Sequence, residues 1–184
     1  MALTESNSFK NGVLAPQFTL LDVITEKKVN LQELKGEKGT VIMFICNHCP
    51  FVVHVNTTLV KLANAYKNKG VNFIAISSND VKNYPQDGPE LMKQVAINLK
   101  YPFPYLYDET QETAKAYNAA CTPDFYVFNS ELKATYHGQL DNSRPGNGIE
   151  VTGADLIHAI EAILNNKAPL KNQKPSIGCN IKWK

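Results

Sequence analysis

Two apolar runs and the helical stripe between them dominate the hydrophobic pattern of this chain. Residues 41–45 are five consecutive apolar residues of mainly β-branched and aromatic type, which is typical of a strand buried on both faces. Residues 50–69 then place their apolar side chains on one helical stripe, which stops at Gly70. Residues 71–76 form a second apolar run. This order predicts a β-α-β unit of a parallel sheet.

Shorter patterns surround this unit and complete an alternation of strands and helices. In chain order they predict a hairpin of strands at 18–22 and 28–30, a helical turn at 31–34, a helix at 89–99, a strand at 104–107, a helix at 109–119, a hairpin of strands at 125–128 and 134–137, and a last helix opened by a capping box of Thr152 and Asp155. We therefore expect one α/β domain over residues 1–184, with a loose N-terminus over 1–12 and an irregular C-terminal tail over 167–184.

Composition narrows the class of protein. Hydrophobic residues make up 43% of the 184 residues and charged residues 20%, which is ordinary for a globular domain with its own core. The net charge of +2, without a basic block, gives no reason to expect nucleic acid or an anionic membrane as partner. Since the first 16 residues lack a signal peptide's apolar core, we expect a cytoplasmic protein, in which four cysteines indicate redox or metal chemistry rather than structural bridges.

The chemistry is concentrated at Cys46-Asn47-His48-Cys49, between the buried strand and the helix. The positive end of a helix stabilises a thiolate, so we expect the first cysteine to have a lowered pKa and to act as the nucleophile. Cys46 is expected to be the more exposed of the two, at or just before the start of the helix. Cys49, expected one turn into the helix, is placed to attack a mixed disulfide formed at Cys46.

Four longer strings carry a resemblance to a known family. They are Cys-Asn-His-Cys-Pro-Phe at 46–51, Ala-Ala-Cys-Thr-Pro-Asp at 119–124, Asp-Asn-Ser-Arg-Pro-Gly-Asn-Gly at 141–148 and Pro-Ser-Ile-Gly-Cys-Asn-Ile-Lys-Trp-Lys at 175–184. From about Leu14 to its last residue, the chain resembles the thioredoxin superfamily, in particular the bacterial peroxiredoxin-like proteins grouped with the AhpC/TSA domain. The resemblance implies a thioredoxin-like α/β fold with an N-terminal β-hairpin and a helix-strand insertion near 89–107, as in peroxiredoxin and TlpA-like proteins.

The resemblance also implies how substrate is held. In thioredoxin-like proteins, the loop matching Thr122-Pro123 carries a cis-proline that faces the dithiol, and its backbone pairs with the substrate. We expect Thr122, Pro123 and Asn47 to contact substrate. His48 lies where disulfide isomerases of the superfamily also have histidine, so it either tunes the redox potential or is a plain solvent-facing residue.

Three further residues are candidate accessory groups, each with a simpler reading. Cys121 is either a third redox thiol or a small buried residue. Cys179 resembles the resolving cysteines on the tails of some peroxiredoxins, although a tail held to the surface by Ile181 and Trp183 is the slightly better explanation. Arg144 is the only arginine of the chain; its guanidinium either binds a ligand or pairs with Asp141 to hold its own loop.

Two alternatives to dithiol exchange stay open. One is an antioxidant thiol peroxidase, but the Pro-x-x-x-Thr-x-x-Cys motif of peroxiredoxins is missing, because Ile42 and Cys46 occupy the proline and threonine positions relative to Cys49. Taking Cys46 as the reactive cysteine places Met43 at the threonine position. The other alternative is a non-enzymatic interaction module or zinc site, whose candidate ligands would be Cys46, His48, Cys49 and His54, with Cys121 as a further candidate.

The sequence therefore predicts a thiol–disulfide oxidoreductase without an organic cofactor or metal. Its expected partners are protein or small-molecule disulfides and thiols, and a thioredoxin-type protein is a candidate reductant.

Overall fold

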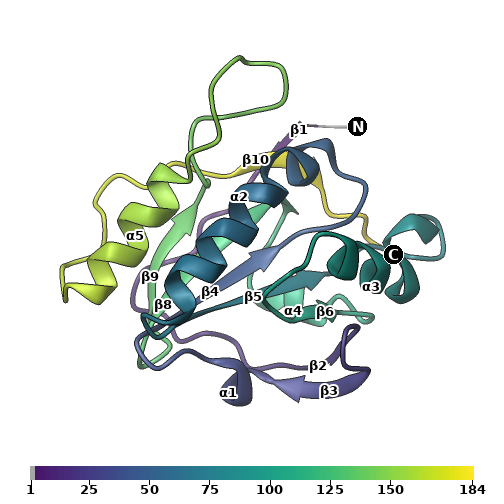
Figure 1. The fold of residues 1–184 in the computed structure, drawn as a ribbon, viewed down its shortest axis with the longest axis horizontal. Helices are drawn as coiled ribbons and strands as arrows, with labels where there is room; N and C mark the ends of the chain where they lie inside the picture. The colour runs from purple at the N-terminus through teal and green to yellow at the C-terminus, as the bar shows by residue number, and fades with distance from the viewer. Residues whose placement is uncertain (1–2) are drawn as a thin grey trace.

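The computed structural model describes residues 3–184, and its centre is a mixed β-sheet (Figure 1). Within this part of the chain, seven strands lie in the order β3 (Lys27–Asn30), β2 (Thr19–Asp22), β6 (Tyr105–Tyr107), β5 (Val71–Ser77), β4 (Gly39–Phe44), β8 (Asp124–Asn129) and β9 (Ala134–Gly138). Strand β5 is parallel to both β4 and β6, whereas the other neighbours are antiparallel. The predicted β-α-β unit and both predicted hairpins are confirmed.

Helices cover both faces of this sheet because its central strand is apolar on both sides. The helices are α1 (Leu31–Leu34), α2 (Pro50–Lys67), the 3₁₀ turn η1 (Pro85–Asp87), α3 (Pro89–Asn98), α4 (Glu112–Ala116) and α5 (Ala154–Leu164). Val41 and Met43 of β4 pack in one core with α2, α3 and α5. Ile42 and Phe44 point to the other face, into a core with α1 and α4. Figure 1 shows α2 and α5 lying across the same face of the sheet.

A second, three-stranded sheet joins the two ends of the described chain. β10 (Ile177–Asn180) lies between β1 (Leu3–Glu5) and β7 (Cys121–Thr122), antiparallel to both. The expectation of an irregular tail over 167–184 was therefore wrong for β10. The expected loose N-terminus over 1–12 was wrong for β1, while residues 1 and 2 lie outside the described part of the chain. Strand pairing between distant segments leaves no periodic signal in four residues of sequence.

Two other local predictions also need correction. The helix expected over 109–119 is shorter, because Gln111 takes a left-handed conformation (φ 64°) and α4 begins only after it. The capping box at the start of α5 was wrong. The N-cap is Gly153, and the Asp141 carboxylate accepts the N–H groups of Thr152 and Gly153.

The strand order determines where loops can meet. Because β4 and β5 are parallel neighbours, the loops that follow their carboxyl ends emerge at the same edge of the sheet. The loop after β4 contains the two cysteines of the motif, and the loop after β5 leads through η1 into α3. No helix among residues 3–184 is long and apolar enough to cross a membrane.

Candidate dithiol site

The two motif cysteines lie between the end of β4 at Phe44 and the start of α2 at Pro50. Cys49 is the N-cap of α2, and Pro50 follows as the first helical residue, where its missing N–H costs nothing. Cys46 therefore lies further before the helix than was expected. Cys49 lies at the N-cap position, whereas it was expected one turn inside the helix. Both are buried: Cys46 is 3% exposed and Cys49 is fully covered, so Cys46 is the more exposed, as predicted.

The loop around Pro123 closes over both sulfurs. The Thr122–Pro123 peptide bond is cis, as the resemblance implied. The Thr122 hydroxyl lies 3.5 Å from Cys46 Sγ, and the Thr122 carbonyl oxygen lies 3.2 Å from Cys49 Sγ. The structure therefore brings Cys46, Cys49, Thr122 and Pro123 together in one site.

Of the two motif cysteines, Cys49 is the one that carries the negative charge of a thiolate. A hydrogen bond from Cys46, and further ones that include the Cys179 thiol, lower the pKa of Cys49 to about 5 against the opposing effect of burial. The hydrogen bond to Cys49, burial and the nearby Asp87 charge all raise the pKa of Cys46. The expectation of a lowered pKa at Cys46 was thus wrong. Cys49 rather than Cys46 caps the helix, and Cys46 is the sulfur nearer to a buried carboxylate.

Asp87 fixes the loop that contains the dithiol. Its side chain is fully buried, and it accepts the backbone N–H of Asn47 at 2.8 Å and that of His48 at 3.4 Å. Its other oxygen accepts from Asn79 Nδ2 at 2.8 Å and lies 2.6 Å from His48 Nδ1. Sequence reasoning did not identify Asp87 as part of the site. A signal was present, because Asp87 follows the strand parallel to the one that leads to Cys46.

The two residues between the cysteines are held by the same loop. The His48 ring bonds to Asp87 and stacks on Tyr84, with ring centroids 5.8 Å apart. The Asn47 side chain donates to the Gln86 carbonyl oxygen and accepts from the Tyr105 hydroxyl. Asn47 thus has partners within the protein, and its expected contact with substrate stays a prediction.

Cys179 completes the group of sulfurs. Its Sγ lies 2.8 Å from Cys49 Sγ, and its strand β10 places it opposite Thr122. The tail is indeed held in place, with Ile181 buried and Trp183 42% exposed. Of the two candidate anchors, only Ile181 is buried. From the sequence, a resolving cysteine and a tail held to the surface were alternative explanations of Cys179. In the structure, the held tail itself brings Cys179 to the dithiol.

The other two accessory candidates lie apart from the reacting sulfurs. Cys121 is fully buried, its Sγ approaches only backbone oxygens of Pro123 and Ser176, and burial raises its pKa. Arg144 donates to the backbone oxygens of Asp141 and Ser143 and to the Gln139 side chain. Arg144 thus holds its own loop as anticipated, although through the carbonyl of Asp141 rather than its carboxylate.

The proposed zinc ligands are not assembled as a set. His54 Nε2 lies 2.7 Å from the Ser143 hydroxyl. Possible donor atoms of Cys46, His48 and Asp87 do lie within 4.8 Å of one another. Asp87 contributes to this group, however, with a carboxylate already engaged by Asn47, His48 and Asn79.

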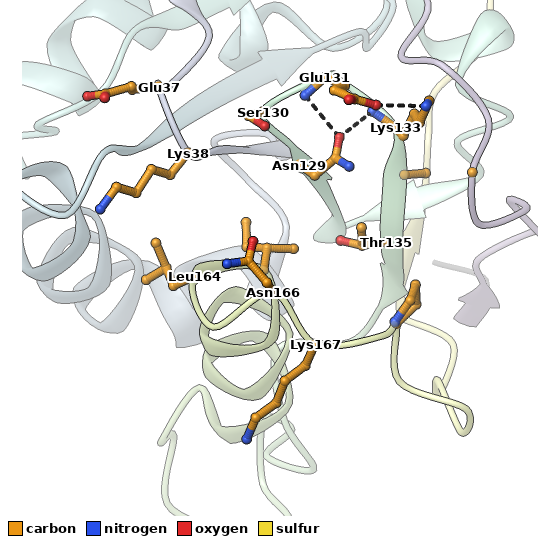
Figure 2. A pocket seen from close by; sticks show the side chains of 14 residues that line it. Glu37, Lys38, Asn129, Ser130, Glu131, Lys133, Thr135, Leu164, Asn166 and Lys167 are labelled. Atoms are coloured by element: carbon orange, nitrogen blue, oxygen red, sulfur yellow. Dashed lines mark hydrogen bonds and ion pairs between the residues drawn. The ribbon is translucent and has the colours of Figure 1, made fainter.

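A hollow of about 710 Å³ lies at the opposite end of β4 from the cysteines (Figure 2). It is bordered by the segment before β4, the turn between β8 and β9, and the end of α5. Its polar groups include Glu131, which forms an ion pair with Lys133, and Asn129, which accepts backbone N–H groups of that turn. Because no cysteine lines it, the hollow offers no thiol chemistry.

A buried dithiol before a helix, faced by a cis-proline loop and carried on this sheet, defines a thioredoxin-like protein. The AhpC/TSA family matches residues 12–137, more than half of the chain, so the chain belongs to the AhpC/TSA family. This confirms the fold and the family that the sequence strings indicated.

Individual relatives agree with this assignment. An uncharacterized conserved protein of Geobacillus kaustophilus is 60% identical, with a TM-score of 0.98 over 100% of this chain and 97% of that one. The curated thiol-disulfide oxidoreductase ResA of Halalkalibacterium halodurans is 26% identical over 82% of this chain and 77% of its own length. The thioredoxin domain of a Bacteroides vulgatus thiol-disulfide oxidoreductase, at 22% identity, shares the fold, with a TM-score of 0.66 over 86% of this chain and all of that one.

Proposed function

We propose that this protein is a thiol–disulfide oxidoreductase whose working pair is Cys46 and Cys49. The observation that carries the proposal is the position of Cys49. It caps α2 and lies 3.2 Å from the carbonyl oxygen of the residue before cis-Pro123. A thiolate at a helix N-terminus beside a backbone loop is what exchange with a disulfide needs. The similarity to ResA supports the same reaction class.

The two cysteines have different parts in the reaction. Cys46 is the entry cysteine, because it is the less buried sulfur and lies beside the Thr122 hydroxyl. As Cys46 attacks one sulfur of the substrate disulfide, its proton passes to the Cys49 thiolate, and the second substrate sulfur leaves as a thiolate. The mixed disulfide therefore forms without a buried charge being created at Cys46.

The second half of the exchange returns the proton. The departing substrate thiolate takes the proton held by Cys49, and the Cys49 thiolate then attacks Cys46 Sγ in the mixed disulfide. The bond between Cys46 and substrate breaks as the Cys46–Cys49 disulfide forms. The substrate sulfur released from Cys46 leaves as a thiolate and takes up a proton from solvent. The substrate has then become two thiols and has gained the two electrons that the protein has lost. The same steps in reverse oxidise a dithiol substrate.

A thiol peroxidase is the second candidate, and the lowered pKa of Cys49 favours it. Peroxide reduction needs a thiolate that peroxide can reach, and Cys49 is fully covered in the reduced protein. Arg144 is also engaged within its own loop. Consumption of hydrogen peroxide in the presence of dithiothreitol, by the protein and by a Cys49→Ser variant, separates this activity from dithiol exchange.

The decisive experiment is equilibration of the protein in glutathione buffers, followed by thiol labelling and mass measurement. We expect a two-electron transition that is abolished in Cys49→Ser and retained in Cys121→Ser, whose sulfur is equally buried and approaches the backbone oxygens of Pro123 and Ser176. A potential near about −270 mV would indicate a reductant and one near about −180 mV an oxidant or isomerase. Thiols that become reactive only after a chelator is added would instead favour the metal site. The cytoplasmic location and the thioredoxin-type reductant stay predictions.

A further inference from the structure

Cys179 is in contact with the dithiol although 130 residues separate it from Cys49. The two sulfurs are 2.8 Å apart, and a disulfide bond is about 2.05 Å long. Strand β10 holds this geometry by pairing Cys179 with Thr122, the residue whose hydroxyl and carbonyl face Cys46 and Cys49. The third sulfur therefore belongs to the same framework as the first two.

The neighbour of Cys179 shows how closely β10 must approach the loop. A side chain on Gly178 would place its Cβ 2.0 Å from the Thr122 carbonyl oxygen and 3.3 Å from Pro123 Cδ. Only a residue without a side chain allows this approach. Gly178 thus lets the backbone of β10 lie directly against the cis-proline loop, which keeps the adjoining Cys179 sulfur at Cys49.

The chain after Cys179 is fixed rather than mobile. The Ile181 N–H donates to the Ala120 carbonyl oxygen, and the Lys182 N–H donates to Asn79 Oδ1. Asn79 is also a partner of Asp87, so the tail and the dithiol loop share a hydrogen-bond network. Figure 1 shows β10 crossing near the end of α2 that follows the cysteines, and β10 and α2 are in contact. A reaction at Cys179 therefore needs no movement of a distant segment.

The charges around Cys179 depend on the redox state of Cys49. Burial, and then the hydrogen bond to Cys49 and its negative charge, raise the pKa of Cys179 to about 12, while Lys182 acts in the opposite direction. Oxidation of Cys49 to a disulfide removes that negative charge. Cys179 thus becomes easier to deprotonate when a disulfide is available for it to attack.

We propose that Cys179 is a third redox thiol, which moves the disulfide of the oxidised protein from Cys46–Cys49 to Cys49–Cys179. This proposal rests on the proposed function. Cys179 loses its proton to solvent, and its thiolate attacks Cys49 Sγ. The Cys49–Cys179 bond forms as the Cys46–Cys49 bond breaks, and Cys46 leaves as a thiolate that takes up a proton. No electrons are gained or lost, so the step needs no external oxidant.

This exchange has a chemical consequence for the entry cysteine. The disulfide would be held between Cys49 and Cys179, while Cys46 returns to the thiol form beside the Thr122 hydroxyl. Cys46 could then react with a second substrate or with a reductant while the protein still holds two oxidising equivalents. The site would act as a three-cysteine relay rather than a simple pair.

Disulfide mapping tests the relay. The wild-type protein and its Cys46→Ser, Cys179→Ser and Cys121→Ser variants are equilibrated in oxidising glutathione buffer, quenched in acid, labelled with N-ethylmaleimide and digested with trypsin. Lysine positions place Cys46 and Cys49 in peptide 39–61, Cys121 in 116–133 and Cys179 in 172–182, so mass spectrometry separates the bridges. Near-ultraviolet circular dichroism checks that each variant is folded.

We expect Cys46→Ser to form a bridge between peptides 39–61 and 172–182, and Cys179→Ser to keep only the bridge inside 39–61. Wild type and Cys121→Ser should contain both bridges. The relay is overturned if folded Cys46→Ser forms no such link and its Cys49 stays reduced or carries glutathione. A bridge inside 39–61 in wild type would in that case leave the proposed function intact, whereas no bridge in wild type would reject the proposed function itself.

Discussion

The His48 imidazole and the Asp87 carboxylate lie 2.6 Å apart, beneath the turn that separates the two cysteines. Because a carboxylate accepts hydrogen bonds, His48 Nδ1 carries the proton in this pair. Asp87 also accepts the backbone N–H groups of Asn47 and His48, so one buried side chain fixes both residues between the cysteines. The geometry of the dithiol thus depends on a residue from the loop after β5.

Replacing Asp87 by asparagine should destabilise the reduced protein by about 1–3 kcal/mol, because an amide nitrogen would then face at least one buried donor. Both carboxylate oxygens accept from two groups each, so neither orientation of the amide avoids this conflict. Urea unfolding measures the change. Glu90→Gln, an exposed acid one turn away, is the matched control and should remain within about 0.5 kcal/mol of wild type. Equal stabilities of the two variants would contradict the role given to Asp87.

The Thr122 hydroxyl should favour the thiolate of Cys46. It lies 3.5 Å from that sulfur, and its hydrogen bond lowers the pKa of Cys46. The hydrogen bond to Cys49, burial and the charge of Asp87 act in the opposite direction and raise that pKa. Thr122→Val should therefore slow alkylation of Cys46 by iodoacetamide several-fold at neutral pH, measured in a Cys49→Ser background by peptide mass. Thr135→Val, which removes a hydroxyl bonded to the Val127 carbonyl far from the cysteines, is the control. Unchanged alkylation in Thr122→Val would show that the hydroxyl does not act on the sulfur.

Most of the fold could be predicted from the sequence because its elements have local patterns. The apolar run of β4 and the stripe of α2 are long enough for their periodicity to define them. The two-cysteine motif between them could likewise be assigned a role from its position. By contrast, the residues that lead into α5 are held by Asp141 of a separate loop, and the local pattern of Thr152 and Asp155 predicted a capping box that is not formed.

The missing parts of the site come from distant segments. Asp87 reaches His48 across 39 residues, and Cys179 reaches Cys49 across 130 residues. Both contacts follow from strand pairing, Asp87 through the parallel pair of β4 and β5 and Cys179 through β10 and β7. The four-residue strand β10 has no alternation long enough to identify it, so its pairing depends on the folded core rather than on its own sequence.

Gly178→Ala tests whether the close approach of β10 holds the site together. An added methyl group would overlap the Thr122 carbonyl oxygen, so we expect a loss of about 1–3 kcal/mol in the free energy of unfolding. Asn180→Ala removes atoms from the same strand without adding any and should cost less. Urea unfolding measures both. A Gly178→Ala protein as stable as wild type would show that β10 can move away from the loop without loss.

The pH dependence of stability tests where the thiolate lies. The pKa of Cys49 falls from 9.0 to about 5 on folding, so the folded protein releases this proton at lower pH than the unfolded chain. The thiolate's stabilising contribution is therefore complete above about pH 9 and is lost as the pH falls from about 9 to about 5.

Above about pH 9, stability decreases with rising pH instead of increasing. Buried Cys46, Cys121 and Cys179 have raised pKa values, so their ionisation favours the unfolded chain and stability falls. Between pH 5 and 9, wild type should therefore gain up to about 1.4 kcal/mol per pH unit relative to Cys49→Ser, measured by urea unfolding under reducing conditions. Subtracting the variant removes the contribution of histidines common to both proteins. Thiolate absorbance at 240 nm provides an independent measurement and should rise near pH 5 in wild type alone. A flat difference, with no absorbance change below pH 7, would show that both cysteines of the pair stay protonated at neutral pH and that Cys49 is not a thiolate.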